Sequence, residues 1–148
     1  MAFYAGPDYE HEGVRIGQPA AGMAGKTRWF AEARRREDVC LFPVYAGGAL
    51  VGEIFLHDQD EGSGESLVGY HIFEPALRGR GTGTKALTLL KRFVAERTGL
   101  RRLVIITSRD NRASQALARR CGFTHTGAPR EDPENGMVFE WLVQAGPG

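Results

Sequence analysis

Several features that would assign the chain to a specialised class of protein are scarce or absent. The 148 residues contain only two cysteines, Cys40 and Cys121, which are too few for a disulfide framework. No pair of Cys or His residues has the spacing of a zinc site, so we expect no metal. The longest apolar runs, such as Leu103 to Ile106, fall far short of the roughly 18 residues that a membrane span requires. These absences predict a cytoplasmic protein that is not inserted into a membrane.

Marks of a targeting signal and of a second domain are also missing. Residues 1–13 contain three acidic residues and no basic segment followed by an apolar one, so we expect no secretory signal peptide. There is no internal repeat and no long linker rich in Pro or Ser. A chain of this length is the usual size of one domain, and the sequence therefore predicts a single domain over residues 1–148.

Net charge is almost absent, but its distribution is uneven. The chain has 19 Lys and Arg residues against 18 Asp and Glu, a net charge of +1. Residues 78–120 contain twelve basic and two acidic residues, a net +10, whereas the remainder, with seven basic and sixteen acidic residues, carries −9. The basic part predicts an anionic ligand. We do not expect nucleic acid, because no aromatic residues that could stack on bases are interleaved with these cations.

The hydrophobic pattern predicts a mixture of strands and helices. Segments of alternating or continuous apolar residues predict strands over residues 14–16, 39–46, 50–57, 67–73, 103–107, 124–128 and 137–143. Apolar residues at helical spacing predict helices over residues 20–36, 83–97 and 111–120. Inward-facing positions of the last helix are expected at Ala113, Leu117 and Cys121. The pair Gly47-Gly48 predicts a tight hairpin turn between the strands over residues 39–46 and 50–57.

The order of these elements predicts the fold class. Antiparallel hairpin strands come first, a β-α-β-α unit follows, and a final hairpin ends the chain. This order predicts an α/β (α+β) fold with a mixed, mostly antiparallel sheet and flanking helices.

The segment from residue 75 to residue 84 has the composition of a phosphate-binding loop. It lies between a predicted strand and a predicted helix, whose first N–H groups have no intrahelical partner and whose dipole attracts anions. Its glycines would let the backbone approach a pyrophosphate, and its arginines would add charge-assisted hydrogen bonds. These residues are Arg78, Gly79, Arg80, Gly81 and Gly83. The alternative interpretation is a glycine-rich surface turn with solvated arginines.

A second glycine-containing segment, residues 20–27, fits a relaxed P-loop pattern that ends in Gly25-Lys26-Thr27. A P-loop needs a buried strand just before it, and Pro19 argues against a central strand there. A nucleotide-dependent enzyme using Lys26 is therefore the lesser alternative.

Two motifs in sequence order resemble those of the GCN5-related N-acetyltransferase (GNAT) superfamily, and most of all its RimJ/RimL-like branch. The pattern R-x-x-G-x-G that begins at Arg78 matches the family's loop for the pyrophosphate of acetyl-CoA. Asn111-x-x-Ser114, followed by Gly122-Phe123, matches its second cofactor-side motif. The resemblance covers about residues 39–143, and the region before it, residues 1–38, is shorter than is usual in the family.

The resemblance implies transfer of an acetyl group from acetyl-CoA directly to a primary amine of a protein N-terminus or a small molecule. The pantetheine arm would enter where two central strands separate, and a backbone N–H near the end of the first of them would polarise the thioester carbonyl. The implied cofactor-binding residues are Ile72, Phe73, Arg78, Gly79, Arg80, Gly81, Thr82, Gly83, Thr84, Asn111 and Ser114. The resemblance also implies a homodimer.

Two residues are candidates for the proton transfers that this reaction needs. Many relatives carry Tyr where this chain has Ala118, and Ser114 is the expected substitute, as the acid or as a cofactor contact, with helix capping as its structural alternative. RimJ/RimL-like relatives often carry Glu where Leu67 stands. His71, on the same strand face, is the expected base. Three carboxylates are reserve candidates: Glu53, Glu65 and Glu74. The missing Tyr and Glu leave open a catalytically weak acyl-CoA-binding or sensing module.

Overall fold

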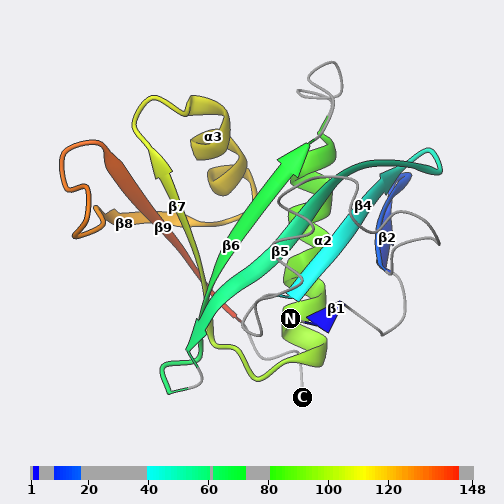
Figure 1. The fold of residues 1–148 in the computed structure, drawn as a ribbon, viewed down its shortest axis with the longest axis horizontal. Helices are drawn as coiled ribbons and strands as arrows, with labels where there is room; N and C mark the ends of the chain where they lie inside the picture. The colour runs from blue at the N-terminus through cyan, green and yellow to red at the C-terminus, as the bar shows by residue number, and fades with distance from the viewer. Residues whose placement is uncertain (1, 4–8, 18–39, 61, 73–80, 144–148) are drawn as a thin grey trace.

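The computed structural model describes residues 2–3, 9–17, 40–60, 62–72 and 81–143. These residues form a nine-stranded sheet in the order β2-β3-β4-β5-β6-β7-β9-β8, with β1 paired to β4 outside this path (Figure 1). The strands are β1 (Ala2–Phe3), β2 (Tyr9–His11), β3 (Val14–Ile16), β4 (Cys40–Ala46), β5 (Ala49–Asp60), β6 (Glu65–Ile72), β7 (Arg102–Ser108), β8 (Thr124–Gly127) and β9 (Gly136–Leu142). The two helices within this part of the chain are α2 (Thr82–Arg97) and α3 (Arg112–Arg120).

The predicted fold class is confirmed. Two strand pairs, β1–β4 and β6–β7, are parallel, and all other pairs among the described strands are antiparallel. The helices α2 and α3 follow β6 and β7 respectively, which gives the predicted β-α-β-α unit. None of the helices that the structure describes is long and apolar enough to cross a membrane.

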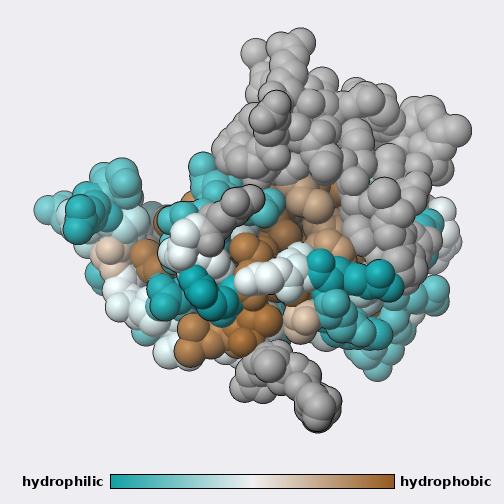
Figure 2. Space-filling view, turned by 90° about the horizontal axis from the view of Figure 1, so that it is seen from below, coloured by the Kyte–Doolittle hydropathy of each residue, from teal (hydrophilic) through white to brown (hydrophobic). Residues whose placement is uncertain are grey.

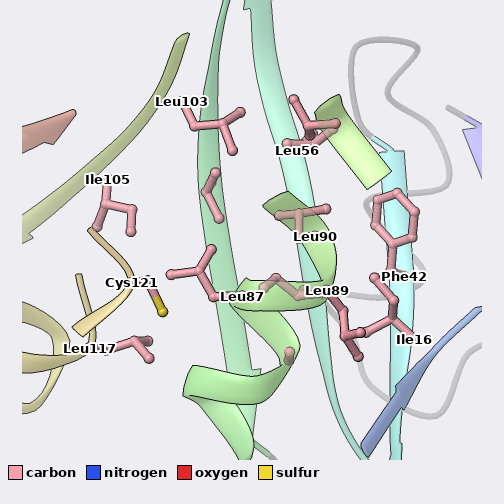
Figure 3. Packing of buried hydrophobic residues seen from close by; sticks show 14 of the residues in the cluster. Ile16, Phe42, Leu56, Leu87, Leu89, Leu90, Leu103, Ile105, Leu117 and Cys121 are labelled. Carbon is pink, nitrogen blue, oxygen red and sulfur yellow. The ribbon is translucent and has the colours of Figure 1, made fainter. Parts of the chain in front are cut away.

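Helix α2 packs its apolar side on the sheet and supplies much of the core. Its buried apolar residues follow the helical spacing of the sequence: Ala86, Leu87, Leu89, Leu90, Phe93 and Val94. In Figure 3, Leu87 faces Leu117 and Cys121 at the end of α3, whereas Leu89 points toward Ile16 on β3. Helix α2 therefore packs against both halves of the sheet within one core, and this packing positions its N-terminal end.

Tight turns join the antiparallel strands. Gly47 and Gly48 connect β4 to β5 with φ angles of 58° and 83°, the positive values that a two-residue hairpin of type I′ requires. The strand predicted over residues 50–57 is longer than expected, because β5 continues to Asp60 and pairs there with Glu65. The amide of Gly64, at φ 73°, donates a 2.8 Å hydrogen bond to the Asp60 carbonyl and closes the turn.

Strands β6 and β7 diverge after a short stretch of parallel pairing. Within the described residues their pairs are Glu65↔Arg102, Ser66↔Leu103 and Leu67↔Val104. Both strands continue beyond these pairs, β6 to Ile72 and β7 to Ser108, and Figure 1 shows them separating toward α3 and the start of α2. The predicted separation of the two central strands is therefore present.

Some expectations were wrong or fall outside the described residues. Ala113 is exposed, not inward, because the buried stripe of α3 runs through Ser114, Leu117 and Ala118. Ile106 on β7 is 48% exposed, since β6 no longer pairs beside it. The sequence pattern missed the short strands β1 and β2. The helix predicted over residues 20–36 lies outside the described residues.

The opposite end of the molecule, where α2 ends and β7 begins, also exposes apolar surface. Figure 2 views this end and shows apolar residues in the middle of the face, with hydrophilic residues on both sides of them. Leu142, at the end of β9, is 64% exposed. This face lies away from the separation of β6 and β7.

Candidate active site

A cavity of about 520 Å³ lies where β6 and β7 separate. Its walls are the end of β6 (Tyr70, His71 and Ile72), the first turn of α2 (residues 81–84) and one side of α3. A small-molecule site usually has a volume of this order. The cavity therefore brings together the strand end, the helix start and the second motif that the sequence separates by up to 50 residues.

The start of α2 is open to the cavity and is not capped by a side chain. Gly81 occupies the N-cap at φ 78°, and among the described residues no side-chain cap or first-turn acidic residue accompanies it. The first N–H groups of the helix have no intrahelical partner, and the helix dipole adds partial positive charge there. Gly83 lies within the helix, where an added Cβ would be 3.6 Å from the Leu117 side chain. This end of α2 is thus suited to an anion.

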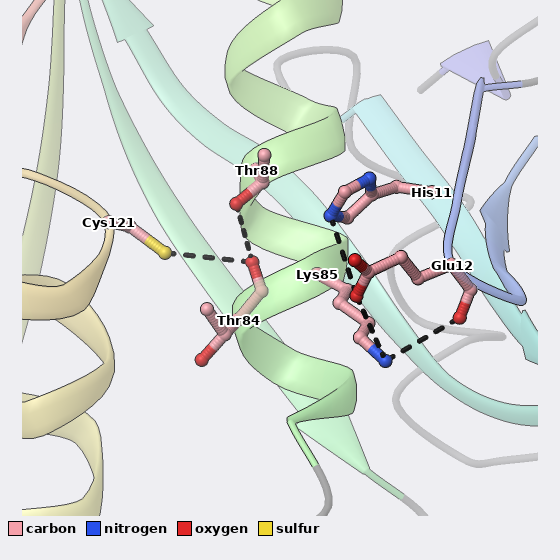
Figure 4. Close-up of polar contacts among 6 residues, drawn as sticks. All are labelled: His11, Glu12, Thr84, Lys85, Thr88 and Cys121. Carbon is pink, nitrogen blue, oxygen red and sulfur yellow. Dashed lines mark hydrogen bonds and ion pairs between the residues drawn. The ribbon is translucent and has the colours of Figure 1, made fainter.

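Contacts on both sides fix the position of this helix start (Figure 4). The Lys85 ammonium lies 3.7 Å from a carboxylate oxygen of Glu12, in the turn between β2 and β3. On the other side, the Cys121 thiol donates to the carbonyl of Thr84 at 3.6 Å, and the Thr88 hydroxyl donates to the same carbonyl at 2.8 Å. The first two turns of α2 are therefore held between the β2–β3 hairpin and the end of α3.

Helix α3 presents its capped first turn to the cavity. The Asn111 side chain accepts a 3.0 Å hydrogen bond from the Ser114 amide, which is the capping role that the sequence offered as the structural alternative. Ser114 is only 6% exposed, and its side chain lines the cavity together with Asn111 and Arg120. Capping uses the Ser114 backbone, so its hydroxyl group remains available for chemistry.

Tyr70 is a cavity residue that the sequence analysis missed. It pairs with Ile54 on β5, a core residue, and so faces the helices, whereas His71 faces the other side of the sheet. Burial raises the pKa of Tyr70, and hydrogen bonding with the Ser114 side chain partly offsets this effect. The alternation of side chains along β6 could have identified Tyr70, since Val68 and Tyr70 share the face opposite to His71.

His71 lies beside a buried carboxyl group on that other face. Strand register places Glu53 directly opposite His71, and the imidazole Nδ1 is 3.9 Å from the Glu53 Oε1. Glu53 is 1% exposed, and its burial raises its pKa from 4.5 to about 7. Within the described residues, neither Glu53 oxygen accepts a hydrogen bond. On sequence grounds Glu53 was a reserve candidate for the base, and in the structure it lies next to His71, the expected base.

The other expected site residues divide into three groups. Ile72, Gly81, Thr82, Gly83, Thr84, Asn111 and Ser114 all line the cavity. Phe73, Arg78, Gly79 and Arg80 lie outside the described residues, as do Glu74 and Lys26. Glu65 is at the opposite end of β6, where its carboxylate lies 3.9 Å from Arg102, so it does not belong to this cavity.

Comparisons with known proteins place the chain in a family. No curated protein matches it. Solved structures with the same fold include the RimL ribosomal L7/L12 alpha-N-protein acetyltransferase (TM-score 0.78, 18% identity, covering 91% of this chain and 96% of that one). Another is the ribosomal-protein-S5-alanine acetyltransferase from Vibrio fischeri (0.74, 12%, 94% and 98%). A third is the microcin C7 self-immunity acetyltransferase MccE, in complex with acetyl-CoA and AMP (0.73, 17%, 90% and 94%). The family described as acetyltransferase (GNAT) domain matches residues 5–124, and the chain belongs to this family.

Proposed function

We propose that this protein transfers the acetyl group of acetyl-CoA to a primary amine, with the cavity between β6, α2 and α3 as the acetyl-CoA site. The observation that carries the proposal is that one cavity joins the uncapped start of α2 to the separation of β6 and β7. The first feature suits a pyrophosphate. The second leaves backbone groups beyond Leu67 without partners on β7, and such groups need hydrogen bonds from elsewhere. The amide groups of a pantetheine arm can supply them.

The proposed cofactor contacts follow from this placement. The N–H groups of Thr82, Gly83 and Thr84 bind the pyrophosphate, and Asn111 and Ser114 line the path of the pantetheine. The backbone of Ile72 lies at the strand end, where an N–H group polarises the thioester carbonyl. Phe73, Arg78, Gly79 and Arg80 complete the proposed set on the basis of the sequence motif.

The amine must be neutral to attack the thioester, so a base has to remove a proton from it. We assign this role to His71, whose side chain is 51% exposed and whose partner across the strands is Glu53. The Nδ1 of the imidazole lies 3.9 Å from the Oε1 of this buried carboxyl group. Together the two groups can accept and hold the proton that the amine releases.

The experiment uses the full chain with acetyl-CoA and a panel of amines: peptides beginning with Ser or Ala, and spermidine. Release of free thiol together with an acetylated product in the mass spectrum is the expected result. Binding of acetyl-CoA in calorimetry without turnover on any amine would overturn the transferase and favour an acyl-CoA-binding module. A response to ATP and none to CoA would favour a P-loop enzyme instead.

The proposal also includes the organisation of the protein. We place one catalytic domain over residues 1–148, with acetyl-CoA and an amine as partners and without nucleic acid, membrane or metal. The protein would act in the cytoplasm as a homodimer, by its resemblance to the family. Light scattering of the purified chain measures the oligomeric state.

A further inference from the structure

Acetyl transfer requires a group that protonates the departing sulfur, and the cavity restricts which side chain can do so. If the proposed function holds, the C–S bond breaks where β6 and β7 separate, and a thiolate forms there. A thiolate that leaves a buried site is stabilised by a proton or a hydrogen-bond donor. The described side chains of the cavity offer few such donors.

Most polar groups of the cavity lie at the proposed phosphate end, already make another interaction, or cannot release a proton. Thr82 and Thr84 belong to the first turn of α2, at the phosphate end of the site. The Asn111 side chain caps α3, and the Arg120 guanidinium does not release its proton in a protein. His71 projects on the opposite side of β6 from Tyr70. Two hydroxyl groups remain, those of Tyr70 and Ser114.

These two hydroxyl groups come from different elements and meet in the cavity. Tyr70 extends from β6 toward the helices, and Ser114 stands in the first turn of α3. Burial raises the pKa of Tyr70, while hydrogen bonding with Ser114 lowers it. A partner that lowers the pKa of a phenol stabilises the phenolate, as a hydroxyl group that donates to the phenol oxygen does. Taking the Ser114 hydroxyl as the donor leaves the Tyr70 proton for a ligand in the cavity that both residues line.

We propose that Tyr70 is the catalytic acid that protonates the sulfur of CoA, and that Ser114 is its positioning residue. The amine nitrogen forms a bond to the carbonyl carbon, and the C–S bond breaks with its electron pair left on sulfur. The Tyr70 hydroxyl group gives its proton to that sulfur, and the phenolate, held by the Ser114 hydroxyl, takes a proton back from water. The proton lost by the amine passes to His71 and then to solvent. No oxidant or reductant is involved.

The first test separates this role from a structural one. Tyr70→Phe keeps the ring that packs in the cavity wall and removes only the hydroxyl group. We expect kcat to fall about 10²-fold, the effect of losing a general acid, with KM for acetyl-CoA unchanged. Tyr9→Phe is the matched control, because Tyr9 is also buried but does not line the cavity, and its kcat should stay at the wild-type value. Ser114→Ala should lower kcat less than Tyr70→Phe, and Ser114→Thr should restore it.

The second test needs no acceptor amine. Bound CoA is titrated through the ultraviolet absorbance of its thiolate, as the difference from the same protein without CoA. Removal of the Tyr70 hydroxyl group should raise the pKa of the bound thiol by about one to two units, the effect of one hydrogen bond to a charged group. Among the described ionisable groups, Cys121 at the end of α3 interacts with Tyr70, Arg120 and His71 line the same cavity, and Lys91 on α2 faces Cys121. The Tyr70→Phe substitution leaves all of them in place.

The outcomes distinguish the inference from the proposed function. Wild-type kcat and an unchanged thiol pKa in a folded Tyr70→Phe variant would overturn the role of Tyr70. A wild-type protein that binds no CoA would overturn the proposed function itself. Thermal unfolding of Tyr70→Phe and Tyr9→Phe shows whether both variants fold, and Ser114→Ala gives a second route if Tyr70→Phe does not.

Discussion

Replacement of Glu53 by Gln should change how the stability of the protein depends on pH. Glu53 is 1% exposed, and burial raises its pKa from 4.5 to about 7. The folded protein therefore keeps a proton on this carboxyl group that the unfolded chain has already released. Between these two values the folded state binds more protons than the unfolded state, so stability falls as the pH rises. A shift of about 2.5 units corresponds to a loss of about 3 kcal/mol above pH 7.

The Glu53→Gln variant has no proton to lose at this position and should lack this part of the pH dependence. We expect its free energy of unfolding, relative to wild type, to rise by about 2 kcal/mol between pH 5 and pH 7 and then to level off. Urea unfolding followed by circular dichroism at pH 5, 6, 7 and 8 measures this difference. A difference that stays constant over the range would refute the conclusion that folding protonates Glu53.

A matched control comes from the other end of the neighbouring strand. Glu65 lies on β6, its side chain is 40% exposed, and its carboxylate is 3.9 Å from Arg102. Glu65→Gln should change the free energy of unfolding by no more than about 1 kcal/mol, as expected for an exposed ion pair. A pH-dependent gain at Glu53 alone would therefore be due to its burial and not to the loss of one negative charge.

Three further substitutions test the cavity walls and the sheet. Gly83→Asp should weaken CoA binding at least tenfold in calorimetry, because a carboxylate at the start of α2 repels phosphate. The same substitution should leave Tm unchanged or higher, since the carboxylate complements the helix dipole. Equal affinity of the variant and the wild type for CoA would mean that the pyrophosphate binds elsewhere. Asn111→Ala should lower the free energy of unfolding by about 1 kcal/mol through loss of the cap, measured in urea. Gly69→Ala should lower it by about 1–3 kcal/mol, since the added Cβ would lie 2.3 Å from the Phe55 ring; an unchanged midpoint would show that this ring moves freely.

Local patterns in the sequence were enough to predict most of the elements and the glycine-rich start of α2. The buried stripe of α2 and the Asn111 cap depend on residues three or four positions apart, so the sequence displays them directly. The hairpin at Gly47 and Gly48 is local in the same sense. The sequence could predict that the starts of α2 and α3 lie together, because each of the two motifs leads into one of these helices.

The chemistry of the site was harder to predict because it depends on pairs far apart in the chain. Tyr70 and Ser114 line one cavity only after α3 has packed against β7 and α2, and nothing adjacent to Tyr70 in the sequence indicates this arrangement. Glu53 is buried through the pairing of β5 with β4 and β6, although its charge suggests an exposed position. Leu117 and Cys121 are buried as expected, but Ala113, four residues before Leu117, is exposed because Ser114 takes the buried place in the first turn of α3.

The pairing of β7 determines when the cavity can form. This strand makes three pairs with β6 but seven with β9, the last strand that the structure describes. During synthesis β7, on which the wall helix α3 packs, therefore cannot take its final place until residues 136–142 have emerged, long after the start of α2. A nascent chain that ends before β9 contains both sequence motifs but cannot hold β7 in place. If the cavity binds acetyl-CoA as proposed, a truncation after β8 should abolish that binding without altering any residue of the cavity lining.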